Sequence, residues 1–209
     1  MKENAEVTNP RATWVNTTHD WSGTIDQDHL EHIRSQPAEY APSGLIHLLL
    51  EVLAYANDEA ESAGRRGTCT VTLHTDSSIA IEDNGRGTDT RVDEHGQLIK
   101  KPIMATQDLR FFANPASPLL PDGHPRRGMS VVAALSDWLV HTNRRLNGSW
   151  TQRYEHGIPV TDLDSIDNTP ATGTTVHFHP NLAYFLHPGL TPTDLDLTFP
   201  HLDITVAAP

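Results

Sequence analysis

The sequence predicts an α+β fold of two layers, with helices on one face of a mixed, mostly antiparallel sheet. Two observations favour it. Residues 43–63 place apolar side chains at helical spacing, and two short runs with alternating side chains, residues 70–73 and 78–81, follow directly. A helix that precedes a hairpin buries its apolar stripe against the sheet, which gives the two layers.

The N-terminal residues are polar and lack clear periodicity, so residues 1–30 are predicted to form an arm. A short helix is expected over residues 27–36, with Asp26 as its N-cap. Pro37 and Pro42 predict an extended link between this helix and the long one.

Further elements follow along the chain. Ser43 is expected to cap the long helix and Gly64 to end it. Residues 85–127 are rich in glycine, proline and charge, which predicts a long loop with one short helix over residues 103–112. Beyond the loop, the sequence predicts a helix that runs into a strand (MSVVAALSDWLV), a hairpin at Asn147-Gly148 with SWTQRYEHGIP as its return strand, and strands in TGTTVHFHP and over residues 201–206.

Composition narrows the functional classes. The 209 residues suit one domain, and a formal net charge of −12 gives no long-range attraction to DNA or to an anionic membrane, so we expect no direct contact with either. No apolar run approaches membrane-spanning length, and the start of the chain lacks an apolar signal core. One cysteine, Cys69, excludes an internal disulfide and fits a reducing cytosol, so a cytoplasmic location is expected.

Two of the thirteen histidines, His177 and His179, alternate in a strand-like run and therefore face one side. Exposed strand histidines are favoured over a metal site, because no cysteine lies nearby and no H-E-x-x-H pattern exists.

Three segments carry candidate chemistry. The long helix holds Glu51 and Asp58-Glu59-Ala60, a strand runs into Asp83-Asn84-Gly85-Arg86-Gly87, and Thr172-Gly173-Thr174 opens a later strand. Glu51 stands among apolar neighbours, where a buried carboxylate is costly without a partner or a task. The alternative is a solvated helix face. Likewise, Asp-Asn-Gly also fits a plain turn after a strand.

In this order and spacing, the three segments resemble the GHKL ATPases, the superfamily of gyrase B, mismatch-repair and heat-shock chaperone ATPases. The resemblance is strongest to the N-terminal ATPase domain of gyrase B. The stretches SVVAALS, TQRYEHGIP and TVHFHPNLAYF add to it, and it covers most of residues 31–181. It implies a GHKL domain over residues 31–209, with a nucleotide pocket between the sheet and helix 43–63. The sequence contains no transducer or DNA-binding domain, so a piece of a longer protein and a divergent stand-alone paralogue are the two alternatives. The altered metal and phosphate motifs favour the paralogue.

The resemblance implies a role for each matching residue. Glu51 matches the general base that activates the attacking water. Asp83 matches the aspartate that accepts a hydrogen bond from the adenine amine, and Thr174 shares that water network. Arg86 matches an arginine that pairs with Glu59 over the adenine pocket, a pair that is alternatively only structural. The nucleotide-binding set implied in this way is Asp83, Gly85, Arg86, Gly87, Glu59, Thr174, Met104, Gly123, Arg126, Arg127 and Gly128.

The metal position departs from the family pattern. Tyr55 stands four residues after Glu51, where the resemblance implies the asparagine that holds magnesium, and Ala54 replaces the preceding aspartate. Asn57 lies six residues from Glu51 and faces elsewhere on the helix. No metal ligand set is therefore predicted, and magnesium binding is left open.

The phosphate loop departs as well. Residues 122–128, DGHPRRG, match a G-G-x-H-G-V-G stretch and keep only Gly123 and Gly128. Pro125 has no amide hydrogen to donate, whereas Arg126 and Arg127 can attract phosphate as charges. Upstream, the run RFFA at residues 110–113 replaces the family's G-G-K-F and puts Phe112 in place of a phosphate-facing lysine.

Three functions remain open. In the first, the chain binds ATP or ADP and hydrolyses ATP weakly or not at all. One version of this function is a gyrase mimic that pairs with gyrase or binds its inhibitors. Alternatively, it is an active ATPase of the gyrase B (type II topoisomerase) kind. Third, it is an interaction protein that binds no nucleotide, with Tyr55 in the phosphate space. A homodimer through the arm, or a partner protein, is compatible with each.

Overall fold

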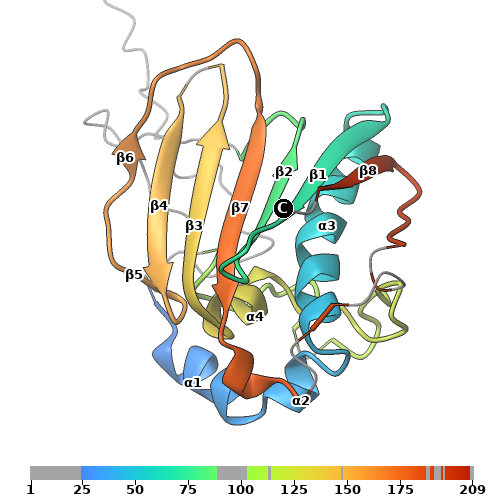
Figure 1. Cartoon of the computed structure of the whole chain (residues 1–209), viewed down its shortest axis with the longest axis vertical. Coiled ribbons are helices and arrows are strands. Elements are labelled where there is room, and N and C mark those ends of the chain that lie inside the picture. Colours follow the sequence, from blue (N-terminus) through green and yellow to red (C-terminus); the bar gives the residue numbers. More distant parts are fainter. Residues whose placement is uncertain are drawn as a thin grey trace, which may run out of the picture.

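The described residues fold around one mixed sheet (Figure 1). The structure is a computed structural model that describes residues 25–88, 103–112, 114–146, 148–186, 189, 190, 194 and 196–207. Its strands are β1 (Gly67–Leu73), β2 (Ile79–Asp83), β3 (Ser136–Arg144), β4 (Trp150–Glu155), β5 (Ile158–Pro159), β6 (Asp164–Ser165), β7 (Gly173–Pro180) and β8 (Leu202–Ala207). They run in the order β5-β4-β3-β7-β2-β1-β8, with β6 beside β4. Only the pair β1–β8 is parallel among them, so the predicted mixed, mostly antiparallel sheet is confirmed.

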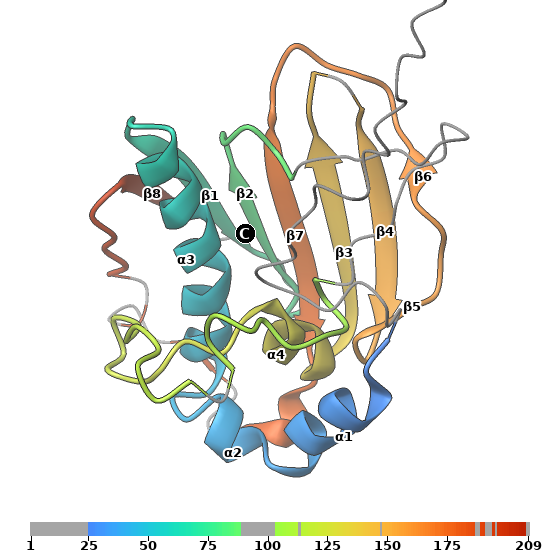
Figure 2. The ribbon, with the colours of Figure 1, turned by 180° about the vertical axis from the view of Figure 1, so that it is seen from behind.

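The helices gather on one face of the sheet and at its lower end (Figure 2). They are α1 (Gln27–Ser35), α2 (Pro37–Tyr40), α3 (Leu45–Ser62) and α4 (Met129–Ala134), with a short 3-10 helix at Leu182–Tyr184. Helix α3 turns an apolar stripe toward the sheet, because its leucines and Val52 recur at helical spacing. The predicted two-layer arrangement is therefore confirmed.

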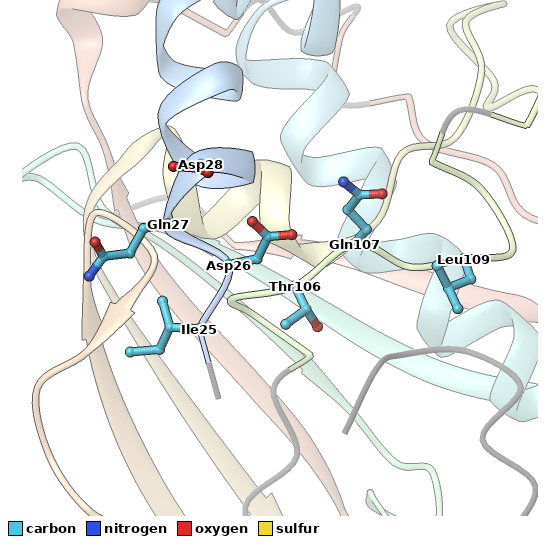
Figure 3. Close-up of a pocket in the computed structure, with 7 residues that line it drawn as sticks. All are labelled: Ile25, Asp26, Gln27, Asp28, Thr106, Gln107 and Leu109. Carbon is cyan, nitrogen blue, oxygen red and sulfur yellow. The ribbon is translucent and has the colours of Figure 1, made fainter. Parts of the chain in front are cut away.

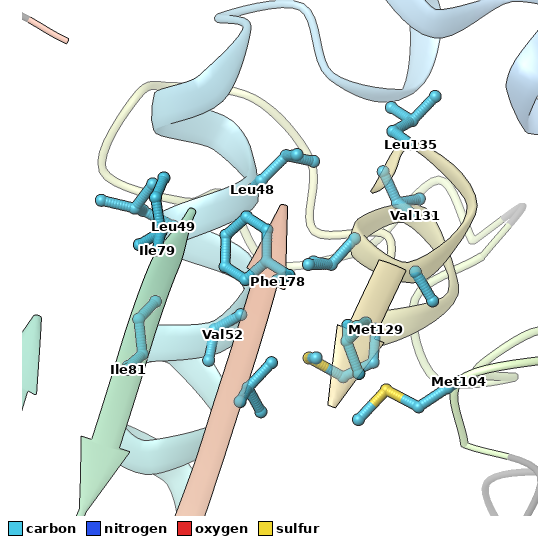
Figure 4. Close-up of a cluster of buried hydrophobic side chains, with 14 of the residues drawn as sticks. Leu48, Leu49, Val52, Ile79, Ile81, Met104, Met129, Val131, Leu135 and Phe178 are labelled. Atoms are coloured by element: carbon cyan, nitrogen blue, oxygen red, sulfur yellow. The ribbon is translucent and has the colours of Figure 1, made fainter. Parts of the chain in front are cut away.

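The core lies between these two layers (Figure 4). Phe178 of β7 has no exposed surface and lies near Leu48 of α3 and Val131 of α4, which are also fully buried. Burial of a side chain of this size contributes about 1.5–3 kcal/mol. These contacts fix α3 and α4 on the sheet, and both helices carry site residues.

Most predicted elements form. The strand-like runs become β1, β2, β7 and β8, and β3 pairs with β4 as the predicted hairpin, although Asn147 itself lies outside the described residues. Asp26 caps α1, since its Oδ1 accepts a hydrogen bond from His29 N at 3.0 Å. Gly64 ends α3 with a φ of 63°, as expected of a glycine that follows a helix. Of the predicted arm, residues 1–24 lie outside the described residues.

Three local predictions are wrong. Gly44, with no side-chain cap, is the N-cap of α3 in place of Ser43. Pro37 begins the short helix α2 instead of an extended link, because the first turn of a helix needs no amide donor from proline. Residues 103–112 form turns rather than a helix, since the Asp108 side chain accepts a hydrogen bond from Arg110 N at 3.0 Å and so competes with helical bonding.

The opposite face of the sheet carries His177 and His179, as their alternation predicts. His177 Nε2 lies 2.9 Å from Ser78 Oγ, and His179 Nδ1 lies 3.2 Å from Asp137 Oδ2. Within the described part of the chain, no helix combines the length and the apolar character needed to cross a membrane.

Candidate functional site

Most of the predicted residues form two clusters. The first, called the Asp83 cluster, comprises Asp83, Gly85, Arg86, Gly87, Glu59 and residues 172–174. Asp83 ends β2, and its Oδ1 accepts a hydrogen bond from Gly85 N at 2.7 Å. Burial raises the pKa of the Asp83 carboxyl, while hydrogen bonds from Gly85 and from Thr174 on β7 act in the opposite direction. Asp83 is thus a half-buried acceptor next to Thr174.

Two glycines in this cluster are required by close backbone contacts. A Cβ atom at Gly173 would lie 1.9 Å from the carbonyl oxygen of Asp83, which no side chain tolerates. Gly87 has a φ of 77°, and a Cβ there would lie 2.5 Å from the carbonyl oxygen of Arg144 on β3. The Asp83 cluster is therefore shaped by the backbones of β2, β3 and β7.

Glu59 and Arg86 form the predicted pair. Arg86 Nε donates to Glu59 Oε1 at 2.6 Å and Nη2 donates to Oε2 at 3.0 Å, a two-pronged contact typical of arginine and carboxylate. The Arg86 amide also donates to Glu59 Oε1 at 3.1 Å. This contact ties the turn after β2 to the last turns of α3.

The second cluster, called the Glu51 cluster, lies where α3 faces the start of α4. It comprises Glu51, Tyr55, Asp58, Asp108, Phe111 and residues 126–128. Glu51 has no exposed surface, so the alternative of a solvated helix face is wrong. Its carboxylate accepts hydrogen bonds from the amides of Arg127 and Gly128, the latter at 3.0 Å. The loop amides that the resemblance assigns to phosphate thus bind a carboxylate of the same chain.

His47 is a site residue that the sequence interpretation missed. Its Nδ1 lies 2.7 Å from Asp122 Oδ2, and its Nε2 lies 3.6 Å from Glu51 Oε1. Burial acts to lower the pKa of His47, but the hydrogen bond to Asp122 and the negative charge of the nearby Glu51 outweigh it and raise the pKa to about 9. The signal was its position four residues before Glu51, on the same helical face.

Tyr55 packs into the Glu51 cluster. Its hydroxyl donates to Asp108 Oδ2 at 2.7 Å, and Arg110 Nη2 donates to the same oxygen at 2.6 Å. Burial acts to raise the pKa of Asp108, but the hydrogen bonds from Arg110 and Tyr55 prevail and lower it. Tyr55 is therefore fixed by an ionised carboxylate that lies 53 residues further along the chain.

The residues at this position do not fit a magnesium ion. Magnesium takes oxygen ligands in octahedral geometry, whereas a tyrosine hydroxyl bonded to Asp108 stands where the resemblance places an asparagine. The Arg126 guanidinium lies 4.3 Å from the Tyr55 ring and would repel a divalent cation. Among the described residues, no group of three histidine, cysteine, aspartate or glutamate side chains is arranged to hold a metal.

Two predicted binding positions, Met104 and Gly123, are not members of either cluster, and neither is Phe112. Met104 is 2 % exposed and belongs to the core, where Figure 4 shows it beside Met129. Gly123 has open space around its Cα. Phe112 stacks on Tyr40, with ring centroids 5.4 Å apart, so it packs against α2 instead of facing a phosphate. Ala113 lies outside the described residues.

A hollow of about 560 Å³ opens between the start of α1 and the turns that follow Met104 (Figure 3). It is lined by Ile25, Asp26, Gln27, Asp28, Thr106, Gln107 and Leu109. None of the predicted site residues lines it, although Gln107 and Leu109 flank Asp108 of the Glu51 cluster.

Comparison with known proteins identifies relatives of the chain. It is 36% identical to the B subunit of DNA gyrase from Thermotoga maritima over 172 residues, which are 80% of this chain and 27% of that protein. It is 35% identical to the B subunit of DNA topoisomerase 4 from Bacillus subtilis over 161 residues, 75% of this chain and 24% of that protein. The chain thus spans about a quarter of the length of these curated relatives. No family model matches it.

Among solved structures, it matches the topoisomerase IV ATP-binding domain of Francisella tularensis, solved with a small-molecule inhibitor. The TM-score is 0.63 and the identity 27%, over 79% of both chains. The mixed sheet with helices on one face matches the fold of this ATP-binding domain, which is the GHKL fold. The chain is thus homologous to about a quarter of the length of the B subunits of gyrase and topoisomerase IV.

Proposed function

We propose that this chain binds an adenine nucleotide through the Asp83 cluster and hydrolyses ATP weakly or not at all. The similarity to a solved structure supports the binding, because that structure is named an ATP-binding domain and holds a small-molecule inhibitor. The Asp83 cluster supports it too, since Asp83 at the end of β2 and Thr174 at the start of β7 lie side by side. An aspartate in this place is the acceptor that the resemblance assigns to the adenine amine.

The observation that carries the hydrolysis part is the environment of Glu51. Both of its oxygens accept amide hydrogen bonds, and Arg126 Nε lies 3.9 Å from Oε2. A general base must contact the water that it activates, so a water would have to displace one of these partners. Phosphoryl transfer also depends on positioning and charge neutralisation, and the residues at Tyr55 do not fit the metal.

Calorimetric titration with ADP, ATP and a gyrase inhibitor tests the binding. Asp83→Asn should weaken ADP binding by about 10- to 100-fold, because hydrogen bonds to charged groups contribute about 1.5–3 kcal/mol. Glu82→Gln is the matched control, since Glu82 is exposed on the other face of β2. Equal weakening by both substitutions, or no ADP binding by the unchanged chain, would refute the binding.

A phosphate-release assay tests the hydrolysis. We expect a rate at the background level, unchanged in Glu51→Gln. A measurable rate that this substitution abolishes would instead establish Glu51 as a working general base and favour the active ATPase.

A second candidate, a domain that binds no nucleotide, is favoured by the packing of Tyr55 against Asp108. In that case neither nucleotides nor gyrase inhibitors bind, and Tyr55→Ala does not restore binding. The same titration therefore separates the two candidates.

A further inference from the structure

Arg126 is a buried cation with unused hydrogen-bonding groups. Its side chain is 5 % exposed, and its Nη1 donates to Asp58 Oδ2 at 2.6 Å. Its Nε and Nη2 have no hydrogen-bond partner among the described residues. Buried donors nearly always have a partner, so two unpaired nitrogens on one buried guanidinium point to a missing acceptor.

The two unpaired nitrogens form one edge of the guanidinium. Nε and one terminal nitrogen together make the fork with which arginine binds a carboxylate or a phosphate through two parallel hydrogen bonds. The nearest acid on that side, Glu51, has its Oε2 3.9 Å from Nε, which is too far for a hydrogen bond. The fork is therefore available to an anion.

Two aromatic rings hold the guanidinium in place. Its central carbon lies 4.3 Å from the centre of the Tyr55 ring and 4.1 Å from that of Phe111. Such cation–π contacts fix the position of the charge without using its donors. Tyr55, at the position implied for the metal-holding asparagine, thus supports a cation of the protein itself.

We propose that Arg126 supplies, as a fixed guanidinium, the positive charge for the nucleotide phosphates, so that this chain takes adenine nucleotides without magnesium. The inference rests on the proposed nucleotide binding and adds its ionic requirement. Because one guanidinium serves the phosphates common to both nucleotides, ADP and ATP bind with similar affinity. Glu51 has to yield its place beside the fork when the phosphates enter.

The test is calorimetric titration of ADP into the whole chain, once with excess magnesium and once with EDTA. We expect the same dissociation constant in both. In EDTA, Arg126→Met should weaken binding by about 10- to 100-fold, because it removes a charge-assisted, two-pronged contact. Arg126→Lys keeps the charge and loses the fork, so its affinity for ADP should lie between that of the unchanged chain and that of Arg126→Met.

Arg153→Met is the matched control, since Arg153 also lies over an aromatic ring, Trp138 at 5.1 Å, but on the other face of the sheet. It should bind ADP as the unchanged chain does. Thermal melting verifies that each variant folds. If Arg126→Met does not fold, the comparison of Arg126→Lys with the unchanged chain is the test.

The outcomes separate the inference from the proposed function. Binding that needs magnesium, or equal affinities for the Arg126 variants and Arg153→Met, overturns the inference and leaves nucleotide binding in place. An unchanged chain that binds no ADP under either condition overturns both.

Discussion

Replacing Asp122 by asparagine tests the buried charge that ties the loop 122–128 to α3. His47 has no exposed surface, and its Nδ1 lies 2.7 Å from Asp122 Oδ2. Burial opposes protonation of His47, but the hydrogen bond to Asp122 and the negative charge of Glu51 prevail and raise its pKa to about 9. Without the Asp122 carboxylate, the pKa of His47 should fall toward its ordinary value.

The size of the effect follows from linkage. The pKa of His47 rises from 6.5 to about 9 on folding, which corresponds to roughly 3 kcal/mol at about 1.36 kcal/mol for each pKa step of one. Because the folded-state pKa is raised, this stability is fully present below pH 6.5 and is lost as the pH rises through 9. The unchanged chain should therefore become less stable over this interval, and Asp122→Asn should show a shallower dependence.

Other groups change the absolute slope but not this difference. Burial raises the pKa of the Cys69 thiol to about 12. Above a pH of about 8.5 this thiol therefore loses its proton in the unfolded chain but not in the folded chain, which also lowers the stability. This loss is the same in both proteins.

Urea unfolding, followed by tryptophan fluorescence at several pH values from 6.5 to about 9, measures the free energy of unfolding. The matched control is Asp137→Asn, which removes a carboxylate 3.2 Å from His179 at a partly exposed position. The control should follow the unchanged chain. Identical pH dependence in all three proteins would refute the assignment of a buried, protonated His47.

Two further substitutions test other parts of the fold. Gly173→Ala would place a Cβ 1.9 Å from the carbonyl oxygen of Asp83, so unfolding in urea should show a loss of about 3 kcal/mol or more. Gly189→Ala, with nothing within 4 Å of its Cβ, is the control, and equal midpoints would contradict the close contact. Burial lowers the pKa of His29 to about 4, so stability should be lost as the pH falls from 6.5 to 4. His29→Gln should remove this loss of stability, whereas the control His32→Gln, at an exposed position, should still show it. The same dependence of stability on acid pH in both variants would argue against a buried, neutral His29.

Elements with a regular pattern could be predicted from the sequence. Helix α3 repeats its apolar residues at helical spacing, and β7 alternates them, because each buries one face against the other layer. The Glu59–Arg86 pair could also be predicted, since the resemblance fixes both positions. The start of α3 could not, because Ser43 and Gly44 both suit an N-cap and the choice depends on the backbone.

The Glu51 cluster could be predicted only in part. Its members on α3 follow from helical spacing, but the Asp108 partner of Tyr55 is 53 residues away and the Asp122 partner of His47 is 75 residues away. No local pattern encodes such contacts, which arise when the loop after β2 folds back on α3. The short helix predicted over residues 103–112 was wrong for the same reason, since Asp108 takes part in this cluster.

The two clusters depend on different parts of the molecule. The Asp83 cluster is set by backbone contacts, such as the approach of Gly173 to the Asp83 carbonyl, and those contacts also hold β2, β3 and β7 in register. A substitution there should therefore cost stability and, in the proposed function, binding as well. The Glu51 cluster is instead made by side chains of a long loop that meet α3, so changes at Tyr55 and Arg126 do not disturb the sheet. In the proposed function, a chain of this fold thus changes how it neutralises phosphate and keeps the cluster proposed to recognise the base.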